Sequence, residues 1–426
     1  MPEVIATVPG DVKALVGVRV LNQLGAYVLP FLAVLAGPGL AAWALGVFGA
    51  AALISRWFGG LLLDHLAPRT VIVLGLTLTG AALLLLAGAH GSAQVLVAVA
   101  LVGLAFEIYE PATQEALASL TTPSDDQPNI RSAGYGLLGT SLVASGAIAG
   151  LLAAVLLPLG VRWLIVVDAA TCLAAATFAL TSLTHTIAVR DSPAWHKLPP
   201  PEGQPWRPDP AAVEGASQSG GRWRPPLMLV RLTVAGTAFA CGSLTVLMFV
   251  PFVLLQRGAP EWLPGLVLTG AAVLAPVTSH LGRKVVDGMG HERVLALGTI
   301  VLGILTLTMA VGRTVPLMIM AYLAWAATDS VLQGRWPALI AEAAPPPDRP
   351  RWFAFHGSSW GIAQPAVPCL VALTGGAMVT AGGAFLLVPL VLATTVGRQS
   401  PPSRPLTESP NVGSRSRTLP WRGDGA

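Results

Sequence analysis

The chain has 426 residues, of which 54% are hydrophobic and only 11% are charged. A soluble domain carries about 25% charged residues, so this composition excludes an ordinary soluble protein and indicates one embedded in a lipid bilayer. The net charge of +4 needs no nucleic-acid partner if the basic residues lie on one side of a membrane. We therefore expect no nucleic-acid binding.

Twelve apolar stretches are long enough to cross a membrane as helices, each of which needs about 20 mostly apolar residues. They predict an all-helical integral membrane protein with twelve transmembrane helices. In chain order the stretches lie near residues 12–36, 40–62, 70–89, 93–118, 132–157, 161–183, 227–255, 262–281, 293–311, 315–340, 352–375 and 378–397.

Most connections between these stretches are short, and the exception divides the chain. Residues 185–226 are rich in Pro, Gly and Ser, as in the run Leu-Pro-Pro-Pro at 198–201, and cannot bury a core. We predict a disordered linker here, between an N-terminal six-helix bundle at 1–184 and a C-terminal one at 227–397. Similar composition predicts a disordered tail at 398–426.

The distribution of Lys and Arg predicts the orientation in the membrane. Eighteen of them fall on the side of the loop that holds Asp64, and three fall in the opposite loops. Cytoplasmic loops carry the excess of basic residues. We therefore expect a multi-pass plasma-membrane protein whose linker and two termini are cytoplasmic.

The stretch that joins the second and third predicted helices returns in the second half of the chain. Aligning Asp64 with Asp287 gives a shift of 223 residues (287 − 64), and Gly59 then meets Gly282. Weak internal symmetry of this kind is typical of secondary transporters. It predicts that the two six-helix bundles are pseudo-symmetric copies of one plan.

Within this stretch, the spacing of Gly60, Asp64, Ala67 and Arg69 resembles the loop signature of the major facilitator superfamily. Ala67 stands where the family prefers glycine, and Pro68 stands where it prefers a basic residue. The chain looks most like the bacterial, actinobacterial-type drug and metabolite exporters of that superfamily.

The resemblance implies a gate that locks the two bundles in one state, formed by Gly60, Asp64 and Arg69 and by Asp287 in the repeated loop. The alternative is a network of helix-end charges that only fixes the fold. The resemblance also implies a central cavity lined by the first, fourth, seventh and tenth helices.

Polar residues inside the predicted fourth helix are candidates for the transport site, because ionisable groups within a membrane usually face a cavity or a partner. Glu107, Glu110 and Gln114 are spaced i, i+3, i+7 and should share one helix face. Arg19 and Asn22 lie in the first helix, and Arg19 is at a similar depth to Glu110. We predict that Arg19 and Glu110 pair, and that Glu107 is either a proton carrier or a buried structural acid.

The predicted tenth helix holds the other candidates. Asp329 lies at mid-depth, with Trp325, Gln333 and Trp336 at i−4, i+4 and i+7. We predict that Asp329 lies across the cavity from Glu107 and is the second candidate for proton coupling. The two tryptophans would either line the cavity or serve as packing residues. An acid beside aromatic rings suggests an amphipathic substrate, cationic or aromatic.

The function that follows is export of a small organic molecule by proton antiport with alternating access. A Gly-Pro-x-x-Gly-Gly turn typical of such exporters is only partly present, at 146–151, so proton-coupled import stays open, as does a transport-inactive, facilitator-like sensor. No catalytic, metal-binding or phosphate-binding motif appears at usable spacing. We therefore expect a monomer that is not an enzyme, with no cofactor or metal, whose partners are its substrate, protons and the lipid bilayer.

Overall fold

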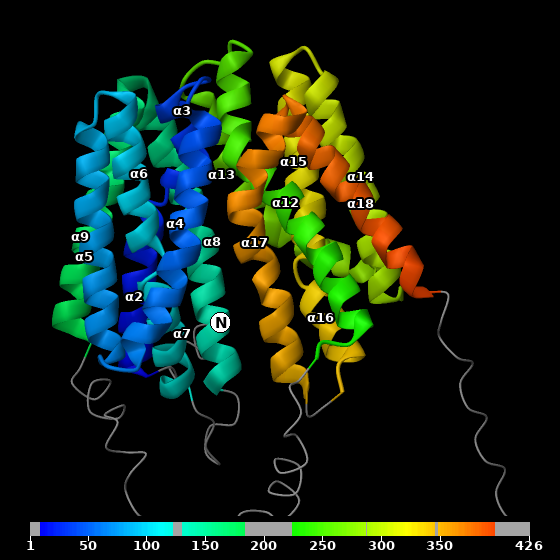
Figure 1. Ribbon diagram of the computed structural model, residues 1–426, viewed down its shortest axis with the longest axis horizontal. Helices are drawn as coiled ribbons and strands as arrows, with labels where there is room; N and C mark the ends of the chain where they lie inside the picture. Colours follow the sequence, from blue (N-terminus) through cyan, green and yellow to red (C-terminus); the bar gives the residue numbers. More distant parts are fainter. Residues whose placement is uncertain (1–8, 122–129, 184–223, 287, 346–347, 397–426) are drawn as a thin grey trace, which may run out of the picture.

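The computed structural model describes residues 9–121, 130–183, 224–286, 288–345 and 348–396, and within these ranges all regular structure is helical. Figure 1 shows two groups of helices side by side. The first group comprises α2 (Gly10–Leu24), α3 (Val28–Ala36), α4 (Ala41–Leu63), α5 (Pro68–Gly88), α6 (Ser92–Phe106), α7 (Tyr109–Leu120), α8 (Ile130–Leu156) and α9 (Val161–Ser182). The second comprises α12 (Leu227–Gln256), α13 (Leu263–Val286), α14 (His291–Val311), α15 (Val315–Leu332), α16 (Arg335–Ala343), α17 (Arg349–Thr374) and α18 (Ala377–Val396).

The predicted all-helical membrane architecture is confirmed, and each of the twelve apolar stretches is helical. By length and composition, ten segments of the described chain could cross a membrane, or eleven if α17 and α18 count as one span bent by 115°. Gly375 lies between α17 and α18 in the left-handed region, at φ 70°, which glycine adopts without steric cost. The predicted linker and tail fall almost wholly outside the described residues.

Three of the predicted helices are broken rather than continuous. The first divides at residues 25–27, the fourth at 107–108 and the tenth at 333–334. At the first break, a Cβ on Gly25 would lie 2.6 Å from the Cα of Asp168 in α9, so only glycine fits there. The backbone N–H of Tyr27, exposed by the break, donates to Oδ2 of Asp168 at 3.4 Å. Buried backbone donors need such partners.

The internal repeat corresponds to a repeated packing contact. A Cβ on Gly59 of α4 would lie 2.6 Å from the carbonyl oxygen of Ile108, at the break between α6 and α7. In the second half, a Cβ on Gly282 of α13 would lie 2.4 Å from Cγ2 of Val331, just before the break between α15 and α16. Ile108 and Val331 are also 223 residues apart (331 − 108). The same shift therefore relates the glycines and the helix breaks that they contact.

The two halves meet mainly on one side of the molecule. We call the side on which α2, α8, α12 and α17 begin the terminal side, and the opposite side the far side. The halves contact through α4 with α17, α8 with α13 and α3 with α12. A Cβ on Gly265 near the start of α13 would lie 2.2 Å from the backbone nitrogen of Ala154 near the end of α8. These ends lie on the far side, and the helix groups diverge toward the terminal side (Figure 1).

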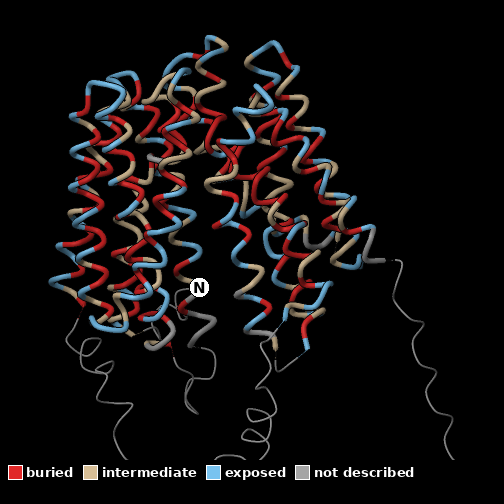
Figure 2. Tube along the Cα trace, in the orientation of Figure 1, coloured by how far each residue is buried: buried red, intermediate tan, exposed pale blue. Residues whose placement is uncertain are grey.

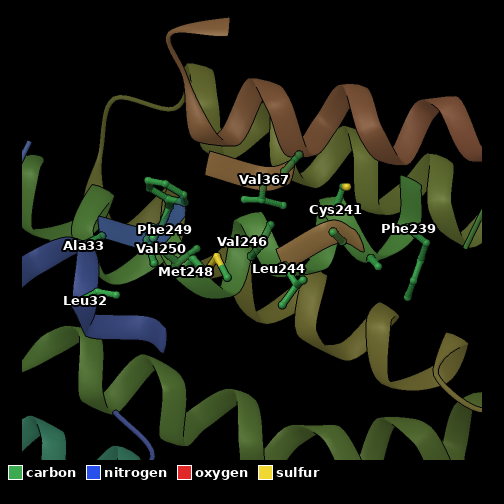
Figure 3. Close-up of a cluster of buried hydrophobic side chains, with 14 of the residues drawn as sticks. Leu32, Ala33, Phe239, Cys241, Leu244, Val246, Met248, Phe249, Val250 and Val367 are labelled. Atoms are coloured by element: carbon green, nitrogen blue, oxygen red, sulfur yellow. The ribbon is translucent and has the colours of Figure 1, made fainter. Parts of the chain in front are cut away.

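Buried side chains fill the interior of each half and also join the halves on the far side. Figure 2 shows the buried residues concentrated within the helix groups. In Figure 3, Phe249 and Val250 of α12 lie close to Leu32 and Ala33 of α3, and all four belong to one buried apolar cluster. Apolar burial thus closes the space between the halves on this side, and it leaves a cavity nearer the middle of the molecule.

Candidate functional site

A cavity of about 560 Å³ lies between the two halves. The α2–α3 break, α6 and α8 supply one wall, and α12, α13, α15 and α17 supply the other. Small and apolar side chains make up most of the lining. The residues with rings or polar groups that matter below are Tyr27, Phe106, Ser243, Tyr322, Trp325, Asp329, Gln333 and Trp360.

Asp329, near the end of α15, is the charged residue in the lining of this cavity. Its Oδ1 accepts a hydrogen bond from Oγ of Ser243 in α12 at 3.3 Å, and its Oδ2 accepts one from Nε2 of Gln333 at 2.9 Å. Within the described ranges it forms no ion pair with a basic residue. Because an ionised carboxylate without a counter-charge is costly away from water, this group favours binding a proton or a ligand that neutralises it.

Aromatic rings surround this acid. Trp325 lies one turn before Asp329 on α15 and stacks on Tyr322, with ring centroids 5.8 Å apart and planes at 13°. Trp360 of α17 and Phe106 of α6 line other parts of the cavity. Trp325 therefore belongs to the lining, as one of the two interpretations of the sequence held. The sequence analysis missed Trp360 and Phe106, for which the only signal was a place in helices that meet between the halves.

Trp336 does not line the cavity, which corrects its assignment as a candidate. It belongs to α16 and is buried, with its ring 5.6 Å from Phe239 and 5.4 Å from His356. The break at 333–334 is the reason, because it ends the regular helical spacing that would have put Trp336 on the face of Asp329. Trp336 is a packing residue of the C-terminal half.

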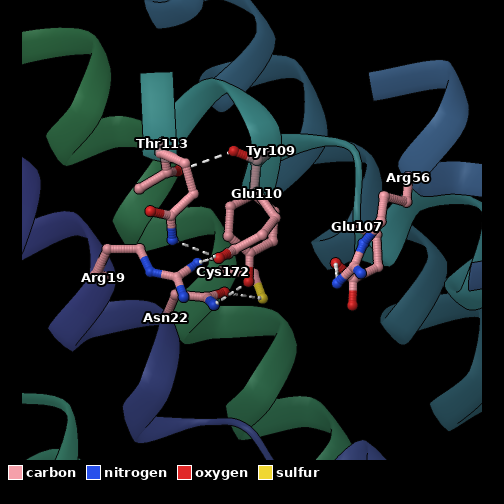
Figure 4. A network of polar contacts seen from close by, with 9 residues as sticks. Arg19, Asn22, Arg56, Glu107, Tyr109, Glu110, Thr113 and Cys172 are labelled. Atoms are coloured by element: carbon pink, nitrogen blue, oxygen red, sulfur yellow. Dashed lines mark hydrogen bonds and ion pairs between the residues drawn. The ribbon is translucent and has the colours of Figure 1, made fainter. Parts of the chain in front are cut away.

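The predicted pair of Arg19 and Glu110 is confirmed. Nη1 of Arg19 donates to Oε2 of Glu110 at 2.5 Å, and the guanidinium lies 5.2 Å from the centre of the Tyr109 ring. Nδ2 of Asn22 donates to the hydroxyl of Tyr109 at 2.8 Å, and Nε2 of Gln114 donates to Oε1 of Glu110 at 3.0 Å. Figure 4 shows this network between α2 and α7. None of its members lines the 560 Å³ cavity, so their assignment as cavity residues is not supported.

Glu107 is separate from this network, although the sequence placed it on one face with Glu110. It is buried at the end of α6, and its Oε2 lies 3.2 Å from Nη2 of Arg56 in α4. Its backbone N–H donates to Oγ of Ser55 at 3.0 Å. The break at 107–108 turns Glu107 away from Glu110, as Figure 4 shows. Arg56, a lone base within an apolar helix, was the sequence signal for this pair.

A family model described as the Major Facilitator Superfamily matches residues 15–284, which is more than half of the chain. The chain belongs to the major facilitator superfamily. It is therefore a secondary transporter and not an enzyme. No curated protein matches the chain.

Solved transporter structures share the fold of this facilitator. A peptide transporter POT in complex with sulfate superposes with a TM-score of 0.69 at 16% identity, covering 93% of this chain and 98% of the other. A D-xylose-proton symporter gives 0.65 at 14% identity, covering 90% and 96%. A POT family transporter in complex with 5-aminolevulinic acid gives 0.67 at 13% identity, covering 92% and 98%. At these identities the likeness shows the fold alone.

The signature loop of this facilitator does not form the expected charge contact. Asp64 caps the end of α4 and is exposed, and its carboxylate makes no hydrogen bond or ion pair in the described chain. Arg69 instead donates from Nη2 to the carbonyl oxygen of Leu180 near the end of α9. Gly60 is exposed, and a Cβ added to it would meet no atom within 4 Å. Asp287 lies outside the described residues.

Proposed function

We propose that this facilitator exports a small organic molecule by proton antiport, and that Asp329 binds the coupling proton. The observation that supports the proposal is the position of Asp329: it lines the cavity between the halves and has only neutral hydrogen-bond partners. A carboxyl in such surroundings is able to take up a proton on one side of the membrane and release it on the other.

Asp329 is a better candidate than Glu107 for this role. The carboxylate of Glu107 is neutralised by Arg56 at 3.2 Å and lies outside the cavity lining. An opposite charge at this distance favours the ionised form of a carboxyl group. Glu107 therefore suits a structural role in holding α4 to the end of α6.

The direction of transport in this proposal rests on orientation. The excess of Lys and Arg around the linker and termini supports a cytoplasmic terminal side. The halves contact each other mainly on the far side, so the described conformation would be closed toward the outside. Inward proton movement would then drive outward movement of the substrate. Import by proton symport is the second candidate, and the fold shared with a D-xylose-proton symporter favours it.

Everted membrane vesicles distinguish these two directions. After acidification of the lumen, a panel of amphipathic organic molecules is added, and the lumenal pH is followed with a fluorescent dye. An antiporter releases lumenal protons when a substrate is added, so the lumen becomes less acidic. We expect this response in the parental protein and its loss in Asp329→Asn at equal protein level. A response of equal size in Asp329→Asn would contradict the role of Asp329, and stable lumenal pH with uptake would contradict antiport.

The proposed topology has its own test. In a variant without the three native cysteines, Ser217→Cys places a single thiol in the 185–226 linker. A membrane-impermeant maleimide should not label it in intact cells and should label it in everted vesicles. Labelling in intact cells would place the linker outside and would reverse the direction of transport inferred above.

A further inference from the structure

We infer that the cavity selects an amphipathic organic molecule with a single positive charge, which replaces the proton on Asp329. This inference rests on the proposed function, since it names the substrate class of the same site. It also gives a physical reason for antiport, because one carboxylate cannot be neutralised by a proton and by a cation at the same time.

The charge of the cavity carries the first step. Asp329 is the charged residue among the described residues that line it, and Ser243 and Gln333 supply only neutral donors. Two neutral hydrogen bonds orient the carboxylate but leave its charge uncompensated. A ligand cation would supply the missing charge. An anion would face a carboxylate with no basic group in the lining, and a zwitterion would leave its own carboxylate without a partner.

The walls of the cavity carry the second step. Trp325 lies one helical turn from Asp329, about 6 Å along α15 at 1.5 Å per residue, and is stacked on Tyr322. Trp360 and Phe106 add rings from the two opposing halves. Aromatic faces attract cations and also bury the apolar body of a ligand. The volume of about 560 Å³ suits a small organic molecule and not a bare inorganic ion.

Competition between proton and cation follows from the groups that face Asp329. The titratable groups that share the cavity are the phenols of Tyr322, on the same helix, and Tyr27, at the start of α3. The residues that α6, α8, α12, α13 and α17 contribute to the lining carry no charge. Cation binding therefore depends on the ionisation of Asp329, and acidification should weaken it.

The test compares two probes of matched shape and opposite charge. Tetraphenylphosphonium and tetraphenylborate are titrated into the purified full-length protein in detergent, and binding is measured by equilibrium dialysis. We expect saturable binding of tetraphenylphosphonium that weakens on acidification, and a loss of at least about tenfold in affinity in Asp329→Asn. Tetraphenylborate should show no loss in that variant. Glu342→Gln, which removes an acid of α16 without a contact in the described chain, is the matched control and should bind tetraphenylphosphonium as the parent does.

The outcomes separate this inference from the proposed function. Equal affinity for tetraphenylphosphonium in the parent and in Asp329→Asn would overturn the inference, and so would saturable binding of tetraphenylborate with no binding of the cation. If proton release in everted vesicles still depends on Asp329 in either case, proton coupling stands and only the substrate class is wrong. If the cation binds as expected but never moves protons, the inference on the ligand holds and transport fails.

Discussion

The breaks between α6 and α7 and between α15 and α16 occupy corresponding places in the two halves, but their polar groups have different partners. Around the first break, Glu107 pairs with Arg56 and Glu110 pairs with Arg19. Around the second, Asp329 has neutral partners only and lines the cavity. The comparison teaches that the N-terminal half uses its charges to join its own helices, whereas the C-terminal half presents one charge to the ligand space.

The repeat makes the comparison residue by residue. Ser55 and Glu107 contact each other in the first half, and the residues 223 positions later are Thr278 and Ser330. The hydroxyl groups of Thr278 and Ser330 lie 2.9 Å apart, so the second half keeps this contact without a charge. The position that corresponds to Asp329 is Phe106 (329 − 223), and both line the cavity. The two walls therefore offer a carboxylate and a phenyl ring from equivalent places.

The largest expected effect is on the paired charges of the N-terminal half. Glu110→Gln leaves Arg19, whose side chain is only 12% exposed, without its counter-charge. Loss of one member of a buried pair costs about 3–5 kcal/mol, so we expect a marked fall in folded protein and in Tm, measured by fluorescence-detected size-exclusion chromatography. The double change Arg19→Gln with Glu110→Gln should recover much of the loss. Gln333→Ala at the corresponding place should cost far less, and an equal cost would break the comparison.

The next effect concerns the glycines that contact the two breaks. Gly59→Ala would bring a Cβ within 2.6 Å of a backbone oxygen, whereas Gly282→Ala would meet the side chain of Val331. A side chain can adopt another rotamer more readily than the backbone can move, so we expect about 1–3 kcal/mol for Gly59→Ala and less for Gly282→Ala. Tm measures both. Gly60→Ala is the control, since nothing lies within 4 Å of the added methyl group, and it should be neutral or stabilising.

A smaller energy is expected at the signature loop. The carboxylate of Asp64 has no partner in the described conformation, so a gate that it forms must act when the terminal side closes. Asp64→Asn should leave Tm unchanged and reduce transport about tenfold, which corresponds to a bias of about 1.4 kcal/mol between the two states. The rate of proton-coupled transport in vesicles measures it, with exposed His65→Gln as the control. Transport at the parental rate would leave Asp64 with only its capping role.

The smallest effect is expected at Glu107. Arg56, its partner, has a side chain that is 46% exposed, and ion pairs with an exposed member contribute about 1 kcal/mol or less. Glu107→Gln should lower Tm slightly and leave proton-driven transport intact, whereas Asp329→Asn abolishes it. If Glu107→Gln instead abolished uphill transport with normal folding, the proton carrier would lie in the N-terminal half and the comparison would be reversed.

The sequence by itself determined the helical membrane fold, the repeat and the pair of Arg19 with Glu110. Apolar stretches of spanning length leave the backbone few alternatives to a helix in a membrane, and a buried arginine needs an acid at its own depth. The shift of 223 residues, read from Asp64 and Asp287, recurs in the contacts of Gly59 and Gly282 with the helix breaks.

Only the tertiary structure decided which polar residues face the cavity. Helical periodicity assigned Glu107 to the face of Glu110 and Trp336 to the face of Asp329, because it assumes a continuous helix. The breaks at 107–108 and 333–334 end that periodicity, and they are set by packing against α4 and α13, which no local pattern records. The direction in which a side chain points beyond a break depends on the neighbouring helices, so Arg56, Trp360 and Phe106 emerged as partners or lining residues only once those helices were in place.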